Sequence, residues 1–216
     1  MKKYEYLLFD LDGTIIDSAE GIYKSFEYAL NHYGIKVDDL NELKPVIGPP
    51  LKDCFMSMYG FSKDKAIEAV AKYRERYSVT GMLECSVYDG VEELLSNLYN
   101  AGYKMVLATS KPEVYAKKIL KNKNLDKYFY YIAGAEIGGT ITDKEDVLRY
   151  ILDTLNITDV SGCLMIGDRK YDLIGAKEFG IDALGVLYGF GSLDELSCYP
   201  SVAIVETPHQ IGEFLI

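Results

Sequence analysis

Short apolar runs separated by amphipathic stretches organise most of the chain. Four runs have the length and composition of buried strands: Tyr6–Phe9, Lys104–Ala108, Cys163–Ile166 and Ala183–Leu187. Three stretches carry apolar residues at helical spacing: Glu92–Tyr99, Glu113–Lys121 and Lys144–Leu155. Because strands that alternate with helices form parallel sheets, the pattern predicts an α/β fold with a doubly wound parallel sheet.

The stretch from residue 16 to residue 82 breaks this alternation, because it holds helical patterns without a buried strand between them. Asp17 and Glu20 have the spacing of an N-terminal capping pair, and a long helix is expected over Lys63–Val79. We therefore predict a core of residues 1–15 and 83–216, with an all-helical module of residues 16–82 inserted after the first strand.

The composition fits a globular protein with no affinity for polyanions. The 216 residues are 49% hydrophobic and 26% charged, as in ordinary folded domains. Lys plus Arg number 23 against 33 Asp plus Glu, and the net charge of -10 argues against binding nucleic acid through its phosphates. No apolar run reaches the roughly 18 residues that a membrane span needs, and Glu5 and Asp10 interrupt the first one. We expect a cytoplasmic protein that binds neither nucleic acid nor a membrane.

The cysteines and histidines favour neither disulfides nor a zinc site. The four cysteines are scattered without a C-x-x-C pair, and the chain has two histidines. A metal would therefore need oxygen ligands, which favours a hard cation such as Mg²⁺.

Two aspartates follow the first predicted strand. Asp10 and Asp12 come directly after it, followed by Gly13 and Thr14, and ligands bind at the carboxyl ends of strands in parallel sheets. If the pair lay about 4 Å from a third carboxylate, each like-charge contact would cost about 4 kcal/mol at an effective dielectric of 20, so a cation would be needed. The alternative is a solvated turn, since Asp and Gly are ordinary turn residues.

A second acidic segment follows the third predicted strand. Gly167 and Asp168 end that strand, and Asp172 comes four residues after Asp168. If a helix begins after Asp168, Asp172 lies in its first turn and points back at the loop. The segment would then supply the missing metal ligand. Helix capping by Asp168 is the alternative.

Two further segments lie where a phosphate would bind. Thr109 and Ser110 place hydroxyls at the end of a strand, and Pro112 at a first helical position would leave backbone N–H groups free for an anion. Lys144 begins the next helix, after Asp143 as the expected N-cap, although the helix dipole disfavours a cation there. A lysine in this place indicates a neighbouring anion, or is simply exposed.

Taken together and in order, these segments resemble the four motifs of the haloacid dehalogenase superfamily over the whole chain. The matching residues are Asp10-Leu11-Asp12-Gly13-Thr14, Thr109, Lys144, and Gly167-Asp168 with Asp172. The inserted module is similar to the helical cap of the phosphoglycolate phosphatase and 5'-nucleotidase-like branch, and Ile47–Leu51 resembles a loop of that branch. The resemblance implies a Rossmann-like core with a cap domain.

The resemblance also implies a reaction. Asp10 would attack phosphorus and form an aspartyl phosphate, and Asp12 would protonate the leaving oxygen and later take a proton from water. Mg²⁺ would be held by a side-chain oxygen of Asp10, the backbone carbonyl of Asp12, and Asp168. Haloacid dehalogenases proper lack the second aspartate and use no metal, so the presence of Asp12 disfavours carbon–halogen cleavage.

The remaining motif residues would bind the phosphoryl group or support the site. Thr109, Ser110 and Lys144 would bind phosphoryl oxygens, and Asp172 would orient Lys144 or a metal-bound water. Three residues would support the loops: Gly13, Thr14 and Gly167.

The expected substrate is a small soluble phosphomonoester of the phosphoglycolate or nucleoside 5'-monophosphate class. Transfer of the phosphoryl group to an acceptor other than water, or a non-catalytic phosphate-sensing role, are the alternatives. Five residues of the inserted module are possible substrate contacts or parts of a solvated helix face: Lys52, Tyr73, Arg74, Arg76 and Tyr77. The oligomeric state, monomer or homodimer, does not follow from the sequence.

Overall fold

The computed structural model describes residues 3–216, and the chain divides into two compact units. The larger unit consists of the residues up to Asp17 together with Val87–Ile216, and the smaller unit is Ser18–Ser86. The first two residues of the predicted core segment 1–15 lie outside the described residues.

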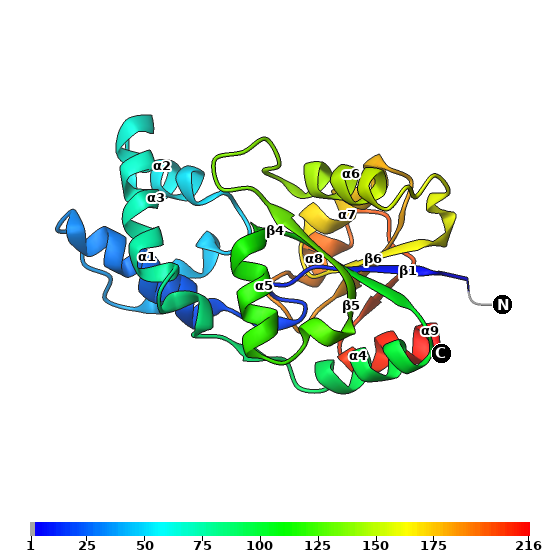
Figure 1. Ribbon diagram of the computed structural model, residues 1–216. Coiled ribbons are helices and arrows are strands. Elements are labelled where there is room, and N and C mark those ends of the chain that lie inside the picture. Colours follow the sequence, from blue (N-terminus) through cyan, green and yellow to red (C-terminus); the bar gives the residue numbers. More distant parts are fainter. Residues whose placement is uncertain (1–2) are drawn as a thin grey trace. The chain divides into compact units, whose positions relative to one another are not determined.

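A parallel six-stranded sheet forms the centre of the larger unit (Figure 1), in the order β5-β4-β1-β6-β7-β8. Its strands are β1 (Tyr6–Phe9), β4 (Lys104–Pro112), β5 (Phe129–Ala135), β6 (Cys163–Gly167), β7 (Asp182–Val186) and β8 (Ala203–Val205). A separate two-stranded sheet pairs β2 (Ile16–Asp17) with β3 (Ser86–Val87). The predicted doubly wound parallel sheet is confirmed, and β5 and β8 are strands that the apolar pattern did not predict.

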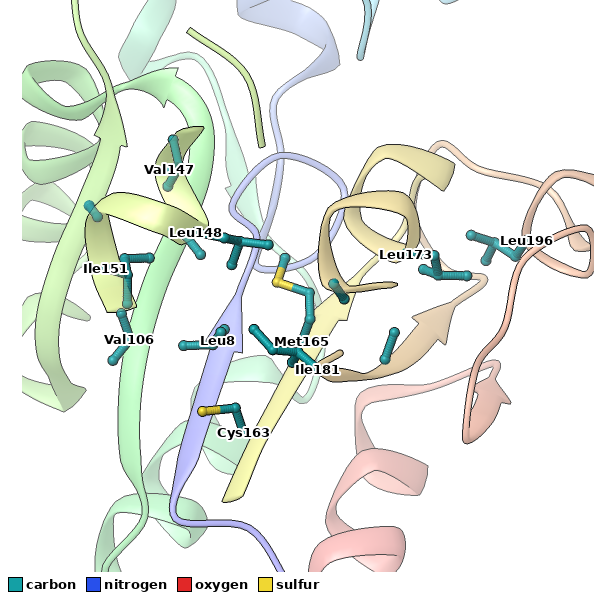
Figure 2. Close-up of a cluster of buried hydrophobic side chains, with 14 residues drawn as sticks. Leu8, Val106, Val147, Leu148, Ile151, Cys163, Met165, Leu173, Ile181 and Leu196 are labelled. Atoms are coloured by element: carbon teal, nitrogen blue, oxygen red, sulfur yellow. The ribbon is translucent and has the colours of Figure 1, made fainter. Parts of the chain in front are cut away.

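Helices cover both faces of the large sheet. The helices of this unit are α4 (Val91–Asn100), α5 (Glu113–Asn122), α6 (Lys144–Thr154), α7 (Lys170–Glu178), α8 (Leu193–Leu196) and α9 (Pro208–Leu215), with short 3-10 turns at Asp126–Tyr128 and Val160–Gly162. Helices α6 and α7 cover one face, and α4 and α9 lie side by side on the other (Figure 1). Figure 2 shows how Leu8, Val106 and Met165, from three neighbouring strands, meet Leu148 of α6 and Leu173 of α7 in one buried cluster. Because alternate strand residues point to opposite faces, this cluster forms only one of the two apolar layers.

The strand register brings distant parts of the chain to one edge of the sheet. Phe9, the last residue of β1, lies opposite Leu107 of β4 and Ile166 of β6. The residues that follow these positions therefore meet at the same end of the sheet. The strand order also reverses at β1, and such a switch point is where open α/β sheets bind ligands.

The smaller unit is helical. It contains α1 (Ala19–His32), α2 (Leu51–Tyr59) and α3 (Lys63–Tyr77), with 3-10 turns at Leu40–Val46 and Gly81–Leu83. The rings of Phe26 and Phe55 stack at 4.1 Å in its core. The N-cap of α1 is Ser18 and not the predicted Asp17, because Asp17 belongs to β2 and the helix begins only at Ala19.

Two further predictions concern the whole chain. Within residues 3–216 we find no helix with the length and hydropathy that a membrane crossing requires. All four cysteines are free thiols, and burial raises the pKa of Cys54 and of Cys163 to about 11. Both buried thiols therefore stay protonated and behave as small apolar side chains.

Candidate active site

Three aspartates meet at the switch point of the sheet. Asp10 follows β1, Asp168 follows β6, and Asp172 lies in the first turn of α7; one carboxylate oxygen of each lies within 4.8 Å of the other two. Asp168 and Asp172 are buried, and Asp10 is partly exposed. The structure thus brings together Asp10 and Asp168, which the resemblance implied as metal ligands, and adds Asp172.

Lys144 lies among these carboxylates. Its Nζ donates to Oδ1 of Asp10 at 2.9 Å and to the carbonyl oxygen of Ala108 at 2.6 Å, and it pairs with Oδ1 of Asp172 at 2.7 Å. Burial alone would lower the pKa of Lys144, but the charges of Asp10 and Asp172 outweigh burial and raise it. Lys144 is therefore a fixed positive charge. The expected N-cap Asp143 is confirmed: its side chain accepts from the backbone N–H of Asp146 and starts α6 at Lys144.

Asp168 has one carboxylate oxygen in a hydrogen bond and one without a partner. Its Oδ2 accepts from the backbone N–H of Phe190 at 2.7 Å, whereas its buried Oδ1 has no hydrogen-bond partner within residues 3–216. Burial raises the pKa of Asp168 well above its ordinary value, and the charges of Asp172 and Asp10 add to this effect. An unpaired buried carboxylate oxygen beside other carboxylates is costly unless a cation compensates it. This donor set therefore fits a hard cation such as Mg²⁺.

The carboxylate of Asp172 contacts both Lys144 and the backbone at the start of α7. Its Oδ2 accepts from the backbone N–H of Arg169 at 3.1 Å, and its Oδ1 pairs with Lys144. Burial raises the pKa of Asp172 to about 6; Lys144 opposes this shift and Asp10 adds to it. Oδ1 of Asp172 has this ion pair with Lys144 but no hydrogen bond of good geometry within residues 3–216, whereas Oδ1 of Asp168 has neither, so Asp172 is better placed than Asp168 to orient Lys144. The N-cap position of α7 is Arg169, so Asp168 does not cap this helix.

Two glycines leave room for the acidic cluster. A Cβ on Gly13 would lie 2.1 Å from Oδ2 of Asp168, and the φ of +83° at Gly13 also disfavours other residues. A Cβ on Gly167 would lie 2.2 Å from Cγ of Asp172. Gly13 therefore lets the loop after β1 approach the loop after β6 closely, and Gly167 leaves room for the side chain of Asp172.

Asp12 pairs with a lysine that the motif analysis did not select. The Nζ of Lys111 donates to both carboxylate oxygens of Asp12, each at 2.6 Å. The Lys111 side chain is 5% exposed and the Asp12 side chain 19%. The two residues are 99 positions apart, so no local pattern reveals the pair. The only sequence signal is that Lys111 follows the candidate phosphate-binding residues Thr109 and Ser110.

The end of β4 differs from the expectation. Thr109 is buried, and its Oγ1 accepts from the backbone N–H of Lys111 at 3.2 Å, while Ser110 is exposed. The strand continues through Pro112, and α5 begins at Glu113. Pro112 is therefore the N-cap residue and not the first residue of the helix, because Pro112 is still paired with Ala135 of β5.

Thr14 and the candidate contacts of the helical unit have local roles. The carbonyl oxygen of Thr14 accepts from the hydroxyl of Tyr188 at 2.9 Å, and Thr14 itself is buried. In the helical unit, Arg76 pairs with Glu84 at 2.7 Å. Tyr73 and Tyr77 are buried with stacked rings. An ion pair thus accounts for Arg76, and ring packing accounts for Tyr73 and Tyr77, among the five residues that were possible substrate contacts.

Comparison with known proteins agrees with this geometry. A family model for haloacid dehalogenase-like hydrolases matches residues 7–186. The 5'-nucleotidase of Pseudomonas aeruginosa is 48% identical over 197 residues, covering 91% of this chain and 89% of that protein. The tyrosine-protein kinase PtkA of Mycobacterium tuberculosis is 39% identical over 190 residues, covering 88% of this chain and 64% of that protein. The crystal structure of a predicted phosphatase from Clostridium acetobutylicum has a TM-score of 0.93 and 46% identity, covering 98% of this chain and 97% of that chain. The parallel sheet and the three aspartates at its strand ends agree with this match, and the chain thus belongs to the haloacid dehalogenase-like hydrolase family.

Proposed function

We propose that the protein is a Mg²⁺-dependent phosphatase that hydrolyses a small soluble phosphomonoester through an aspartyl phosphate. One observation carries this proposal: the carboxylate of Asp10 is held by Lys144 beside the unpaired oxygen of buried Asp168. A nucleophile, a fixed cation and a metal-binding oxygen thus converge where a phosphoryl group would bind. The similarity to a 5'-nucleotidase and to a predicted phosphatase supports this reaction class.

In the first step, a carboxylate oxygen of Asp10 forms a bond to phosphorus while the ester bond to the leaving oxygen breaks. Asp12 supplies the proton that the leaving oxygen takes up. Lys144 and the hydroxyl of Thr109 bind phosphoryl oxygens and compensate their charge. Asp10, the backbone carbonyl of Asp12 and Asp168 would hold Mg²⁺, which supplies positive charge that reduces repulsion between the carboxylate and the phosphoryl group.

In the second step, water attacks the aspartyl phosphate, and the bond between Asp10 and phosphorus breaks. Asp12, left without its proton by the first step, accepts a proton from this water. Inorganic phosphate leaves, and Asp10 and Asp12 return to their starting states. One carboxyl group thus acts as acid and then as base.

Hydrolysis of p-nitrophenyl phosphate tests the proposal. We expect Mg²⁺-dependent turnover by the wild type that EDTA abolishes, and a loss of more than about 10³-fold in Asp10→Asn, which lacks the nucleophile. Asp126→Asn is the matched control and should keep full activity, because Asp126 is exposed and lies in the turn directly before β5, at the opposite end of the sheet from the site residues. Equal hydrolysis by the wild type and Asp10→Asn would refute the proposed chemistry.

A substrate panel then tests the substrate class. Nucleoside 5'-monophosphates come first because of the similarity to the 5'-nucleotidase, followed by phosphoglycolate, sugar phosphates and pyrophosphate. We expect the highest kcat/KM among the nucleoside monophosphates or phosphoglycolate. The role of residues 16–82 as a cap and the cytoplasmic location stay predictions.

Transfer of the phosphoryl group to an acceptor other than water is a second candidate. The 39% identity to the tyrosine-protein kinase PtkA favours it. A hydrolase and a transferase can share the first step, since both form the same aspartyl phosphate. A rise in turnover on addition of an alcohol or a tyrosine-containing peptide, with phosphate found on the acceptor, would support transfer.

A further inference from the structure

We propose that Lys111 is the positioning residue for Asp12: it holds the carboxyl group of Asp12 in the orientation that protonates the leaving oxygen. The inference rests on the proposed phosphatase reaction and deepens it. It assigns a task to a residue outside the four motifs, and it predicts which phosphate esters need that residue.

The geometry of the pair is the first observation. A lysine ammonium donates three hydrogen bonds, and Lys111 directs its ammonium at both oxygens of one carboxylate, each at 2.6 Å. Two such contacts restrain rotation of the ionised Asp12 carboxylate more than one contact would. When one oxygen of Asp12 carries the proton, the other can still accept from Lys111. Asp12 therefore stays bonded to Lys111 in both steps of the reaction, through two contacts when it is ionised and one when it is protonated.

Burial is the second observation. The Lys111 side chain is 5% exposed, whereas lysine is almost never buried without a partner for its charge. The Asp12 side chain is 19% exposed, so part of it remains accessible. The pair thus combines a buried, fixed end with an accessible end, which is the arrangement that a positioned acid needs.

The backbone of Lys111 adds a third observation. Its N–H donates to Oγ1 of Thr109 at 3.2 Å. Because the hydroxyl oxygen accepts this bond, the hydroxyl hydrogen remains available as a donor to a phosphoryl oxygen. Lys111 thus contacts both the candidate phosphate-binding hydroxyl and the candidate acid. Lys111 therefore links the position of Asp12 to that of Thr109.

Leaving groups of different basicity test the proposal. p-Nitrophenolate leaves without protonation, whereas an alkoxide must be protonated, so only alkyl esters depend on a well-placed acid. We compare kcat/KM for p-nitrophenyl phosphate with kcat/KM for adenosine 5'-monophosphate or phosphoglycolate, whichever the wild type hydrolyses faster. In Lys111→Met we expect a loss of about 10²-fold for the alkyl ester and of less than about 5-fold for p-nitrophenyl phosphate.

Two further variants make the result interpretable. Lys117→Met removes an exposed lysine that pairs with Glu113 on α5, and it should change neither rate. Lys111→Gln keeps an uncharged N–H donor on a side chain that is one bond shorter, and it should restore part of the alkyl ester activity. Circular dichroism checks that each variant is folded.

The outcomes separate the two hypotheses. If the wild type hydrolyses neither ester, the proposed function fails. If the wild type hydrolyses both but Lys111→Met lowers both rates by the same factor, or neither, the positioning role is overturned. Unfolding of both Lys111 variants would assign the residue to stability and also overturn the proposal.

Discussion

Removing one negative charge from the acidic cluster should stabilise the metal-free protein while abolishing its response to Mg²⁺. The substitution is Asp168→Asn. Asp168 is buried, its Oδ1 has no partner within the described chain, and its neighbours Asp10 and Asp172 place oxygens within 4.8 Å. An asparagine oxygen can still accept from the backbone N–H of Phe190, and the amide nitrogen then replaces the unpaired oxygen beside two carboxylates.

The magnitude follows from the distances. Two unit charges 4.8 Å apart repel by about 3.5 kcal/mol at an effective dielectric of 20. Lys144 pairs with Asp10 and Asp172 and offsets a large part of this repulsion. We therefore expect Asp168→Asn to raise the free energy of unfolding in EDTA by about 1–2 kcal/mol. Because the raised pKa of Asp168 means that its ionised form destabilises the fold, the gain should be absent near pH 4 and grow as the pH rises towards neutrality.

Urea unfolding followed by circular dichroism, in EDTA and in Mg²⁺, measures both effects. Mg²⁺ at about 100 times its dissociation constant should stabilise the wild type by about 2.7 kcal/mol and leave the variant unchanged. Asp182→Asn is the matched control, because hydrogen bonds from Tyr4 and Lys3 lower the pKa of Asp182 and its substitution should not stabilise the protein. A variant that is less stable than the wild type in EDTA at neutral pH would refute the electrostatic reasoning.

Three further predictions test neighbouring features. Lys144→Met should lower kcat/KM for p-nitrophenyl phosphate by at least about 10²-fold, because it removes the buried positive charge that contacts Asp10 and Asp172; an active variant would remove Lys144 from the mechanism. Gly13→Ala should eliminate the stabilisation by Mg²⁺ in urea unfolding, since its Cβ would overlap an oxygen of Asp168, and a normal Mg²⁺ response would show that the loop can shift. Glu84→Gln should destabilise the protein by about 1 kcal/mol at pH 7. Since the hydrogen bond from Arg76 lowers the pKa of Glu84, this difference should disappear as the pH falls through that pKa, which acid titration of the two proteins checks.

The sequence predicted the buried strands better than those at the edges of the sheet. β1 and β6 are continuous apolar runs because both faces of the sheet are covered there, and such runs can be recognised in the sequence alone. β5 lies at an edge, mixes partly exposed tyrosines with small residues, and was missed. β8 has three residues, too few for any periodicity. The limits of each helix, in contrast, were predicted to within a few residues where an apolar stripe marks one face.

For the candidate site, local motifs indicated the residues but not their partners. The segment around Asp10 and the segment around Asp168 each end a buried strand, and the register of β1 with β6 places them together. The pairing of Lys111 with Asp12 depends on how far β4 extends past Ala108. The sequence pattern ended that strand too early, so the direction of the Lys111 side chain could not be inferred. Contacts of this kind arise from tertiary structure alone.

The central position of β1 also constrains how the protein folds. Tyr6 pairs on one side with Lys104 and on the other with Cys163, so β1 leaves the ribosome well before either of the strands that it pairs with. Such non-local pairing slows folding and leaves the apolar run Leu7–Phe9 without cover in the nascent chain. The reactive centre therefore cannot assemble until most of the polypeptide has left the ribosome, and a truncated product would carry the nucleophile without its surroundings.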